Sequence, residues 1–268
     1  METIREGQVG KAIVRLLRTK DGYATTVFVN GERKFLEFGA DSEDIWRRGH
    51  DAAARLNPVF VGYDGARRRF LSFFPRGFRD DDYIKQERSK KLVAKAFLDS
   101  AAPLDRARQH PGCAKAALKA YQKTEIVAAQ DRIKLTSVLS GSNADNFVQA
   151  AAAFAENDWK PALAALNAIL KPEGCASWSV VTYLPFLWKP ETHAFLKPNM
   201  TCEFAERVGH AFADRYESAL NSAVYDAFLE LAEEVKAKTL DLGIEDMIDV
   251  QSFMYTAVNY TEDDRPDR

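Results

Sequence analysis

The stretch Val27–Phe38, VFVNGERKFLEF, decides the fold class of the N-terminal part of this chain. A β-branched and aromatic run ends at the pair Asn30-Gly31, and a second apolar run follows three charged residues. Asn-Gly is the pair that two-residue hairpin turns favour, because both turn positions need a positive φ. Runs of this composition on either side of the pair are typical of paired strands. The stretch therefore predicts a β-hairpin.

A second stretch, Val59–Phe74, repeats this order as VFVGYDGARRRFLSFF, with Asp64-Gly65 at the turn. It predicts a second hairpin in the same sheet as the first. Between the two, Asp41–Leu56 opens with acidic residues that suit a helix N-terminus, and Asn57-Pro58 ends the helical pattern. We therefore expect residues 1–78 to form a small α+β domain with two β-hairpins and a helix.

The rest of the chain, residues 79–268, predicts a larger and mainly α-helical domain, so the expected fold class is α+β. Residues 80–97 begin with three aspartates and place Arg88, Lys91 and Lys95 on one helical stripe beside an apolar arc. Residues 171–198 interrupt the helical pattern with several of the chain's prolines and tryptophans. We expect an ordered Pro/Trp-rich segment there, which is either a functional loop or a rigid packing arm.

Composition limits the class of protein. Hydrophobic residues make up 46% of the 268 and charged residues 28%, which is typical of a folded domain. No apolar stretch approaches the roughly 20 residues that cross a bilayer, and the N-terminus lacks the apolar core of a secretory signal. We expect a cytoplasmic protein without a membrane partner. The three cysteines, Cys113, Cys175 and Cys202, are too few and too widely spaced for a disulfide framework or a metal site, and we expect no cofactor.

The net charge of −2 hides a division between the two halves of the chain. Residues 1–135 carry 27 Lys and Arg against 18 Asp and Glu, whereas residues 136–268 carry 10 against 21. Such asymmetry favours an anionic partner for the basic half and a protein partner for the acidic, helical half. We predict a non-enzymatic protein that binds nucleic acid, DNA or RNA, through its N-terminal half. The cations expected to contact phosphates are Arg33, Lys34, Arg67, Arg68, Arg69, Arg76, Arg79, Lys85, Arg88, Lys91 and Lys95.

Other interpretations stay open. The arginines after the turns could be solvated residues that protect edge strands, and lysines late in a helix could complement its dipole. The basic and acidic halves could match other subunits, which would make the chain a protein–protein adaptor. A divalent-metal nuclease is a further alternative, because Asp21, Glu32 and Lys34 follow the order in which two carboxylates hold the ion and a lysine steadies the attacking water.

The C-terminal third contains a pattern made of Pro185–Leu187, Pro190, His193, Phe195–Pro198 and Ile248–Phe253. This pattern resembles one in a family of uncharacterised bacterial proteins. No activity or catalytic residue is attached to that family, so the resemblance implies a bacterial, cytosolic source. As a nucleic-acid-binding protein of a bacterial cell, the chain is expected to be an accessory subunit of a defence or mobile-element system.

Overall fold

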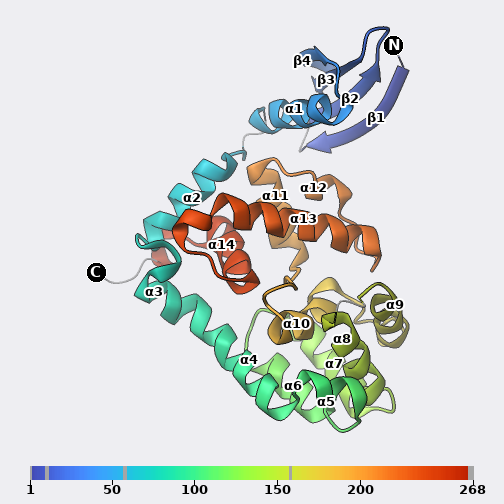
Figure 1. Ribbon diagram of the computed structural model, residues 1–268, viewed down its shortest axis with the longest axis vertical. Coiled ribbons are helices and arrows are strands. Elements are labelled where there is room, and N and C mark those ends of the chain that lie inside the picture. Colours follow the sequence, from blue (N-terminus) through green and yellow to red (C-terminus); the bar gives the residue numbers. More distant parts are fainter. Residues whose placement is uncertain (1, 10–11, 57–58, 157–158, 265–268) are drawn as a thin grey trace. The chain divides into compact units, whose positions relative to one another are not determined.

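The computed structural model describes residues 2–9, 12–56, 59–156 and 159–264 and has an α+β fold, with a sheet followed by a larger helical part (Figure 1). The expected fold class is confirmed. The chain forms two compact units, which we call the sheet unit (Met1–Arg69 and Thr201–Tyr216) and the helical unit (Phe70–Met200 and Glu217–Arg268). This division falls inside two helices, whereas the sequence predicted a domain boundary after residue 78.

Four antiparallel strands form the sheet in the order of the chain. They are β1 (Glu2–Val9), β2 (Ala12–Arg18), β3 (Tyr23–Val29) and β4 (Glu32–Gly39). The hairpin predicted from Val27–Phe38 is confirmed as β3 and β4. Its turn has a positive φ at both Asn30 (51°) and Gly31 (80°), the backbone geometry whose twist matches that of the flanking strands.

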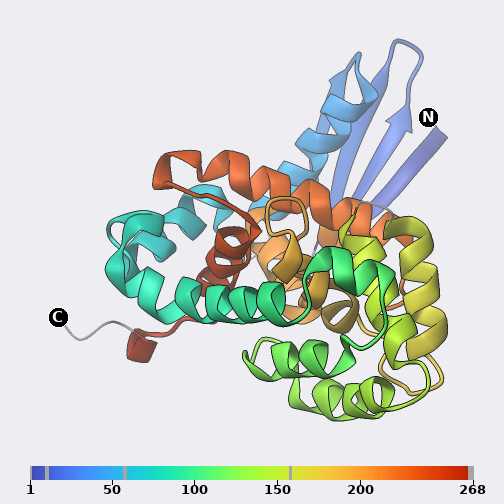
Figure 2. The same ribbon diagram turned by 60° about the horizontal axis from the view of Figure 1, so that its bottom comes forward.

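Helix α1 (Ser42–Arg55) lies along one face of the sheet, which confirms the helix predicted after the hairpin (Figures 1 and 2). It buries Ile45 and Trp46 in a core that the inward side chains of the strands complete. Gly49 brings the helix backbone close to the sheet, because a Cβ at this position would lie 2.0 Å from Thr25 Oγ1. The apolar stripe of α1 thus fixes which face of the sheet is covered.

The second predicted hairpin is wrong, because Gly62–Phe73 forms helix α2. The pair Asp64-Gly65 lies in the first turn of this helix instead of in a hairpin turn. Ala66, Phe70 and Phe74 are fully buried, and their spacing of four residues is that of one helix face. Apolar residues in this stretch fit both a strand period and a helix period, so the tertiary partners of the aromatic rings decide between the two.

The chain after α2 is built from short helices. It contains η1 (Gly77–Arg79), α3 (Asp81–Tyr83), the π-helical turn η2 (Ile84–Arg88), α4 (Ser89–Ala101), α5 (Leu104–Gln109), α6 (Ala114–Gln122), α7 (Ala129–Ser140), α8 (Ala144–Ala155), α9 (Trp159–Leu170), α10 (Trp178–Trp188), α11 (Pro198–Val208), α12 (Phe212–Arg215), α13 (Ser222–Lys238), η3 (Leu240–Leu242), α14 (Met247–Asn259) and η4 (Glu262–Asp264). The predicted helix over residues 80–97 is present, interrupted by the π-helical turn. Within the described residues, no helix combines the length and the apolar character needed to cross a membrane.

Helix α10 lies within residues 171–198, for which the sequence left open a functional loop or a rigid packing arm. Ser177 begins the helix, and its Oγ accepts a hydrogen bond from the Val180 amide at 3.4 Å. Every residue of α10 is buried, including Pro185 inside the helix. A helix that is buried on all sides has no polar face, so its sequence shows no helical period. The prediction of an interruption in the helical pattern depended on the prolines of this segment, although only Pro185 lies within α10.

Candidate nucleic-acid interface

The helical unit holds six of the cations predicted to contact phosphates, and most of them bind the protein's own carboxylates. Arg79 and Lys85 are exposed. The other four form ion pairs at N···O distances of 2.5 to 3.0 Å: Arg76 with Asp81, Arg88 with Asp246 and Asp249, Lys91 with Glu87, and Lys95 with Asp99. These pairs neutralise charges that the sequence analysis had assigned to a ligand.

The predicted basic stripe faces inward. The side chain of Lys91 is 3% exposed and that of Arg88 is 12% exposed, whereas Val93 in the predicted apolar arc is 58% exposed. Helix α14 supplies the partners, because Arg88 Nη1 lies 2.5 Å from Asp249 Oδ1 and Lys91 Nζ lies 3.0 Å from Ser252 Oγ. A charged side chain can be buried when it is paired and hydrogen-bonded, and this network meets that condition.

The sheet unit holds the remaining five predicted cations. Arg67, Arg68 and Arg69 lie on helix α2, so successive side chains point about 100° apart instead of alternating across a strand. Arg68 and Arg69 are exposed, and Arg67 is half-buried. Arg33 and Lys34 are exposed on β4, where the sequence placed them, so the strand prediction is correct for these two residues only.

The three residues of the predicted nuclease core do not come together. Asp21 lies in the turn before β3, whereas Glu32 and Lys34 follow its far end, and a seven-residue strand spans roughly 20 Å. Lys34 Nζ bonds instead to Glu32 Oε2 at 2.6 Å. Throughout the described ranges, no group of three His, Cys, Asp or Glu side chains is placed to hold a metal ion.

The face of the sheet opposite α1, which we call the open face, carries exposed apolar side chains. Side chains alternate between the two faces of a strand, so the buried residues on the α1 side define the outward positions. Phe28, Leu36 and Phe38 are outward because Val27 and Phe35 next to them pack in the core with α1. The outward side chains of Phe38 and Leu36 are 57% and 39% exposed. A surface of this kind marks a binding site more often than an isolated exposed residue does.

Two arginines lie beside the aromatic ring of Phe28 on this open face. Arg33 is directly opposite Phe28 in the register of β3 and β4, so both side chains share one face. The Arg15 guanidinium lies 5.3 Å from the centre of the Phe28 ring, and its Nε bonds to Glu6 Oε2 at 2.6 Å. The register thus places cations and a half-buried aromatic ring together.

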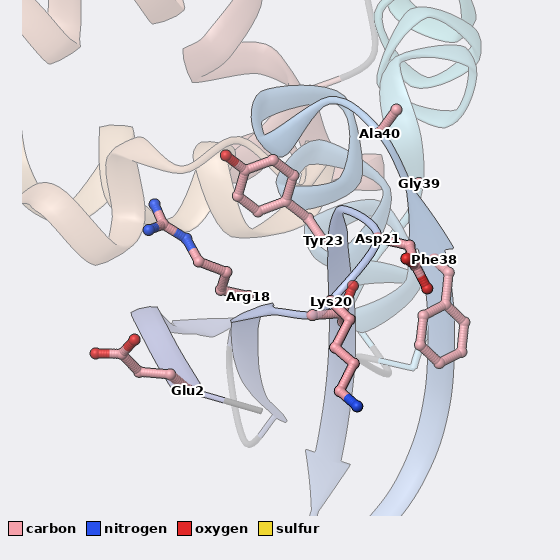
Figure 3. A pocket seen from close by; sticks show the side chains of 9 residues that line it. Glu2, Arg18, Lys20, Asp21, Tyr23, Phe38, Gly39 and Ala40 are labelled. Carbon is pink, nitrogen blue, oxygen red and sulfur yellow. The ribbon is translucent and has the colours of Figure 1, made fainter.

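A hollow of about 950 Å³ lies at the end of the sheet that is far from the β3–β4 turn, where β2 and β3 are joined. Figure 3 shows Phe38 and Lys20 pointing to one side of this end and Tyr23 to the other. Tyr23 packs against the core under α1, which is consistent with Phe38 lying on the open face. The open face therefore carries an aromatic ring and a nearby cation at each end.

No family model, no curated protein and no solved structure matches this chain. The resemblance of its C-terminal third to bacterial proteins stays a prediction. The open face was missed by sequence reasoning, although a signal was present. At outward positions the strands carry apolar residues where a sheet that exposes one face to water usually carries polar ones, namely Ile13, Leu17, Phe28, Leu36 and Phe38.

Proposed function

We propose that this protein binds single-stranded nucleic acid on the open face of its N-terminal sheet. The observation that carries the proposal is the presence of two outward phenylalanines, Phe28 and Phe38, with Arg33 and Arg15 beside the first ring. Unpaired bases stack on aromatic side chains that project from a sheet, and this stacking tolerates any base. Arg33 next to such a ring supplies charge for the phosphates, whereas Arg15 is paired with Glu6.

The two rings are far enough apart to contact different bases. Phe28 pairs with Arg33 near the turn of β3 and β4, whereas Phe38 pairs with Ala24 near the other end of these strands. Four residues along a strand separate the two positions, which corresponds to roughly 13 Å. Leu36 lies between them on the same face and offers apolar contact to an intervening base. A duplex cannot present its bases in this way, so the geometry favours an unpaired strand.

The proposal retains a non-enzymatic role and moves the binding surface from a wide basic patch to the sheet face. An accessory function in a bacterial defence or mobile-element system belongs to the same proposal, of which only the bacterial source rests on the resemblance described above. A protein–protein adaptor is the second candidate. The outward Ile13 and Leu36 favour it, because aliphatic side chains on a flat sheet also suit a protein partner.

Fluorescence anisotropy with labelled oligo-dT, oligo-rU and a DNA duplex tests the proposal. We expect the single strands to bind more tightly than the duplex, with an affinity that falls as salt rises. Phe38→Ala should weaken binding roughly 5- to 140-fold, which corresponds to about 1–3 kcal/mol per stacked base. Arg33→Gln should lower the slope of log K against log salt by about 1.

Matched controls are exposed residues on helices of the helical unit. Ile133→Ala removes an apolar side chain that is 70% exposed, and Arg106→Gln removes one exposed charge. Neither should change the affinity. Absence of binding to either oligonucleotide at low salt would refute the proposal and leave the adaptor. Equal affinity of wild type and a folded Phe38→Ala would show that the sheet face is not the binding surface.

A further inference from the structure

The helical unit contains a pocket of about 460 Å³ whose wall is rich in lysine. Its lining comes from the π-helical turn and the start of α4, the segment that follows α6, the residue before α11, and one face of α14. A volume of this size is in the range of sites for small molecules. The residues that line it are Gln86, Glu87, Lys90, Lys91, Lys123, Thr124, Glu125, Ile126, Lys197, Gln251 and Tyr255.

The pocket has an excess of positive charge. Four lysines and two glutamates line it, and the Lys91 ammonium is already matched by Glu87, with Nζ 2.7 Å from Glu87 Oε2. Lys90, Lys123 and Lys197 then face a single further carboxylate, that of Glu125. The lining therefore has a formal charge of +2, which would balance the charge of −2 on a phosphate monoester dianion.

Both carboxylate oxygens of Glu87 accept hydrogen bonds from the protein itself, which reduces their repulsion of an anion in the pocket. Glu87 Oε1 accepts a hydrogen bond from the Tyr260 hydroxyl at 3.0 Å, and its Oε2 accepts one from Lys91. Lys91 also donates to Ser252 Oγ at 3.0 Å. Burial lowers the pKa of the Lys91 ammonium, whereas Glu87 acts to raise it. This buried pair forms a fixed floor, whereas Lys90 and Lys123 of the same lining are exposed, with the Lys123 ammonium 4.6 Å from the centre of the Phe97 ring.

A polar group on the wall lacks a partner. Gln251 is 2% exposed, and its Oε1 accepts no hydrogen bond from the described residues. A buried carbonyl oxygen without a donor costs free energy of roughly 1–3 kcal/mol. Beside it, the Tyr255 ring is half-buried and the Lys197 ammonium lies 5.6 Å from its centre. The wall thus offers an acceptor and an aromatic surface next to the cations.

The backbone at this pocket has a rare geometry. Ile84–Arg88 is a π-helical turn, a conformation that occurs mostly as single turns and often at functional sites. Arg88, the last residue of this turn, forms ion pairs with the N-cap of α14 and with the helix itself. Its guanidinium nitrogens lie 2.9 Å from Asp246 Oδ2 and 2.5 Å from Asp249 Oδ1. Gln86 and Glu87 of the same turn line the pocket.

We propose that this pocket binds a small organic phosphate, a phosphate monoester whose remaining part carries hydroxyl or N–H donors. Lys90, Lys123 and Lys197 contact the phosphate, and Gln251 Oε1 accepts a hydrogen bond from the organic part. Nucleoside monophosphates and sugar phosphates share this chemistry. The site lies within the helical unit and does not depend on the proposal for the sheet face.

Isothermal titration calorimetry with the full chain tests the site, using AMP, ribose 5-phosphate, inorganic phosphate and adenosine as probes. We expect AMP or ribose 5-phosphate to bind with a dissociation constant below about 1 mM, and adenosine not to bind. Tighter binding of AMP than of ribose 5-phosphate identifies a nucleotide site in which a base contacts Tyr255. Equal binding of the two identifies a sugar-phosphate site.

The double variant Lys123→Gln/Lys197→Gln should weaken binding of the better probe about 10-fold or more, because a hydrogen bond to a charged group contributes about 1.5–3 kcal/mol. Lys115→Gln/Lys119→Gln is the matched control, since it removes two exposed charges from α6 outside the pocket. Three results would overturn the inference: no binding of AMP or ribose 5-phosphate, binding of adenosine as tight as that of AMP, or the same affinity in both double variants.

Discussion

Replacing Arg88 by Met should destabilise the helical unit by about 3–5 kcal/mol at pH 7. The guanidinium lies 2.9 Å from Asp246 Oδ2 and 2.5 Å from Asp249 Oδ1, and its own side chain is 12% exposed. Asp249 is the decisive partner, because its side chain is only 1% exposed. Without Arg88 it keeps the hydroxyl of Tyr83 and the amide of Glu245 as donors.

The magnitude follows from leaving a buried carboxylate without its cation. Removing one member of a buried ion pair costs about 3–5 kcal/mol, because the other charge stays buried and uncompensated. The pair of Arg88 with Glu245 adds little, since the Glu245 side chain is 72% exposed. Burial already raises the pKa of Asp249, and Arg88 opposes that shift. The variant should therefore take up a proton at Asp249, and its deficit should shrink as pH falls.

Urea unfolding followed by circular dichroism at pH 7 and pH 5 measures this effect. Arg106→Met, which changes an exposed arginine on α5, is the control and should stay within about 0.5 kcal/mol of wild type. The double variant Arg88→Met/Asp249→Leu should recover part of the loss, because it removes the buried carboxylate of Asp249 and leaves only Asp246, the N-cap of α14, without its cation. A loss below about 1 kcal/mol in Arg88→Met, or the same loss at both pH values, would refute the reasoning.

Three further predictions concern packing, protonation and helix capping. Gly49→Ala should lower the melting temperature through a loss of about 1–3 kcal/mol, because its Cβ would lie 2.0 Å from Thr25 Oγ1, and an unchanged melting temperature would contradict this. Burial lowers the pKa of His193 to about 4. The free energy of unfolding should therefore fall by about 3 kcal/mol between pH 6.5 and pH 4, because the unfolded chain binds the proton more readily than the buried imidazole does. An NMR titration of His193 with a midpoint near pH 6.5 would disprove the lowered pKa. Asn221→Ala should cost about 1 kcal/mol in urea unfolding, since Asn221 Oδ1 accepts the Val224 amide at 3.0 Å, and an unaltered midpoint would show that the cap is dispensable.

Local sequence was sufficient where neighbouring residues set the backbone. The turn at Asn30 and Gly31 needs two positive φ values, and the pair itself provides them at low cost. Local sequence was insufficient for Val59–Phe74, where a similar pattern of apolar runs around an Asp-Gly pair forms the start of a helix. Phe70 decides that case through rings far along the chain, with Tyr83 at 5.8 Å and Phe253 at 5.3 Å between ring centres.

The candidate sites divide in the same way. Arg33 was found from sequence because it follows a recognisable turn, and the strand register then places it opposite Phe28. Lys91 was predicted to contact phosphate, yet it pairs with Glu87 four residues earlier and with Ser252, which stands 161 residues away in the chain. The sequence shows the first spacing, whereas no local pattern reveals the second partner or the burial of the pair. The lysine pocket was missed for this reason, since its cations come from separate helices and loops.

The amino-acid sequence by itself determined the α+β class, the β3–β4 hairpin and the excess of cations in the first half, because turn chemistry, helix period and charge are local properties. Only the tertiary structure decided which of those cations remain available to a ligand. Burial of Arg88 and Lys91 is tolerated because α14 and the segment before it bring carboxylate and hydroxyl oxygens to them, and such compensation exists only once distant segments have packed together.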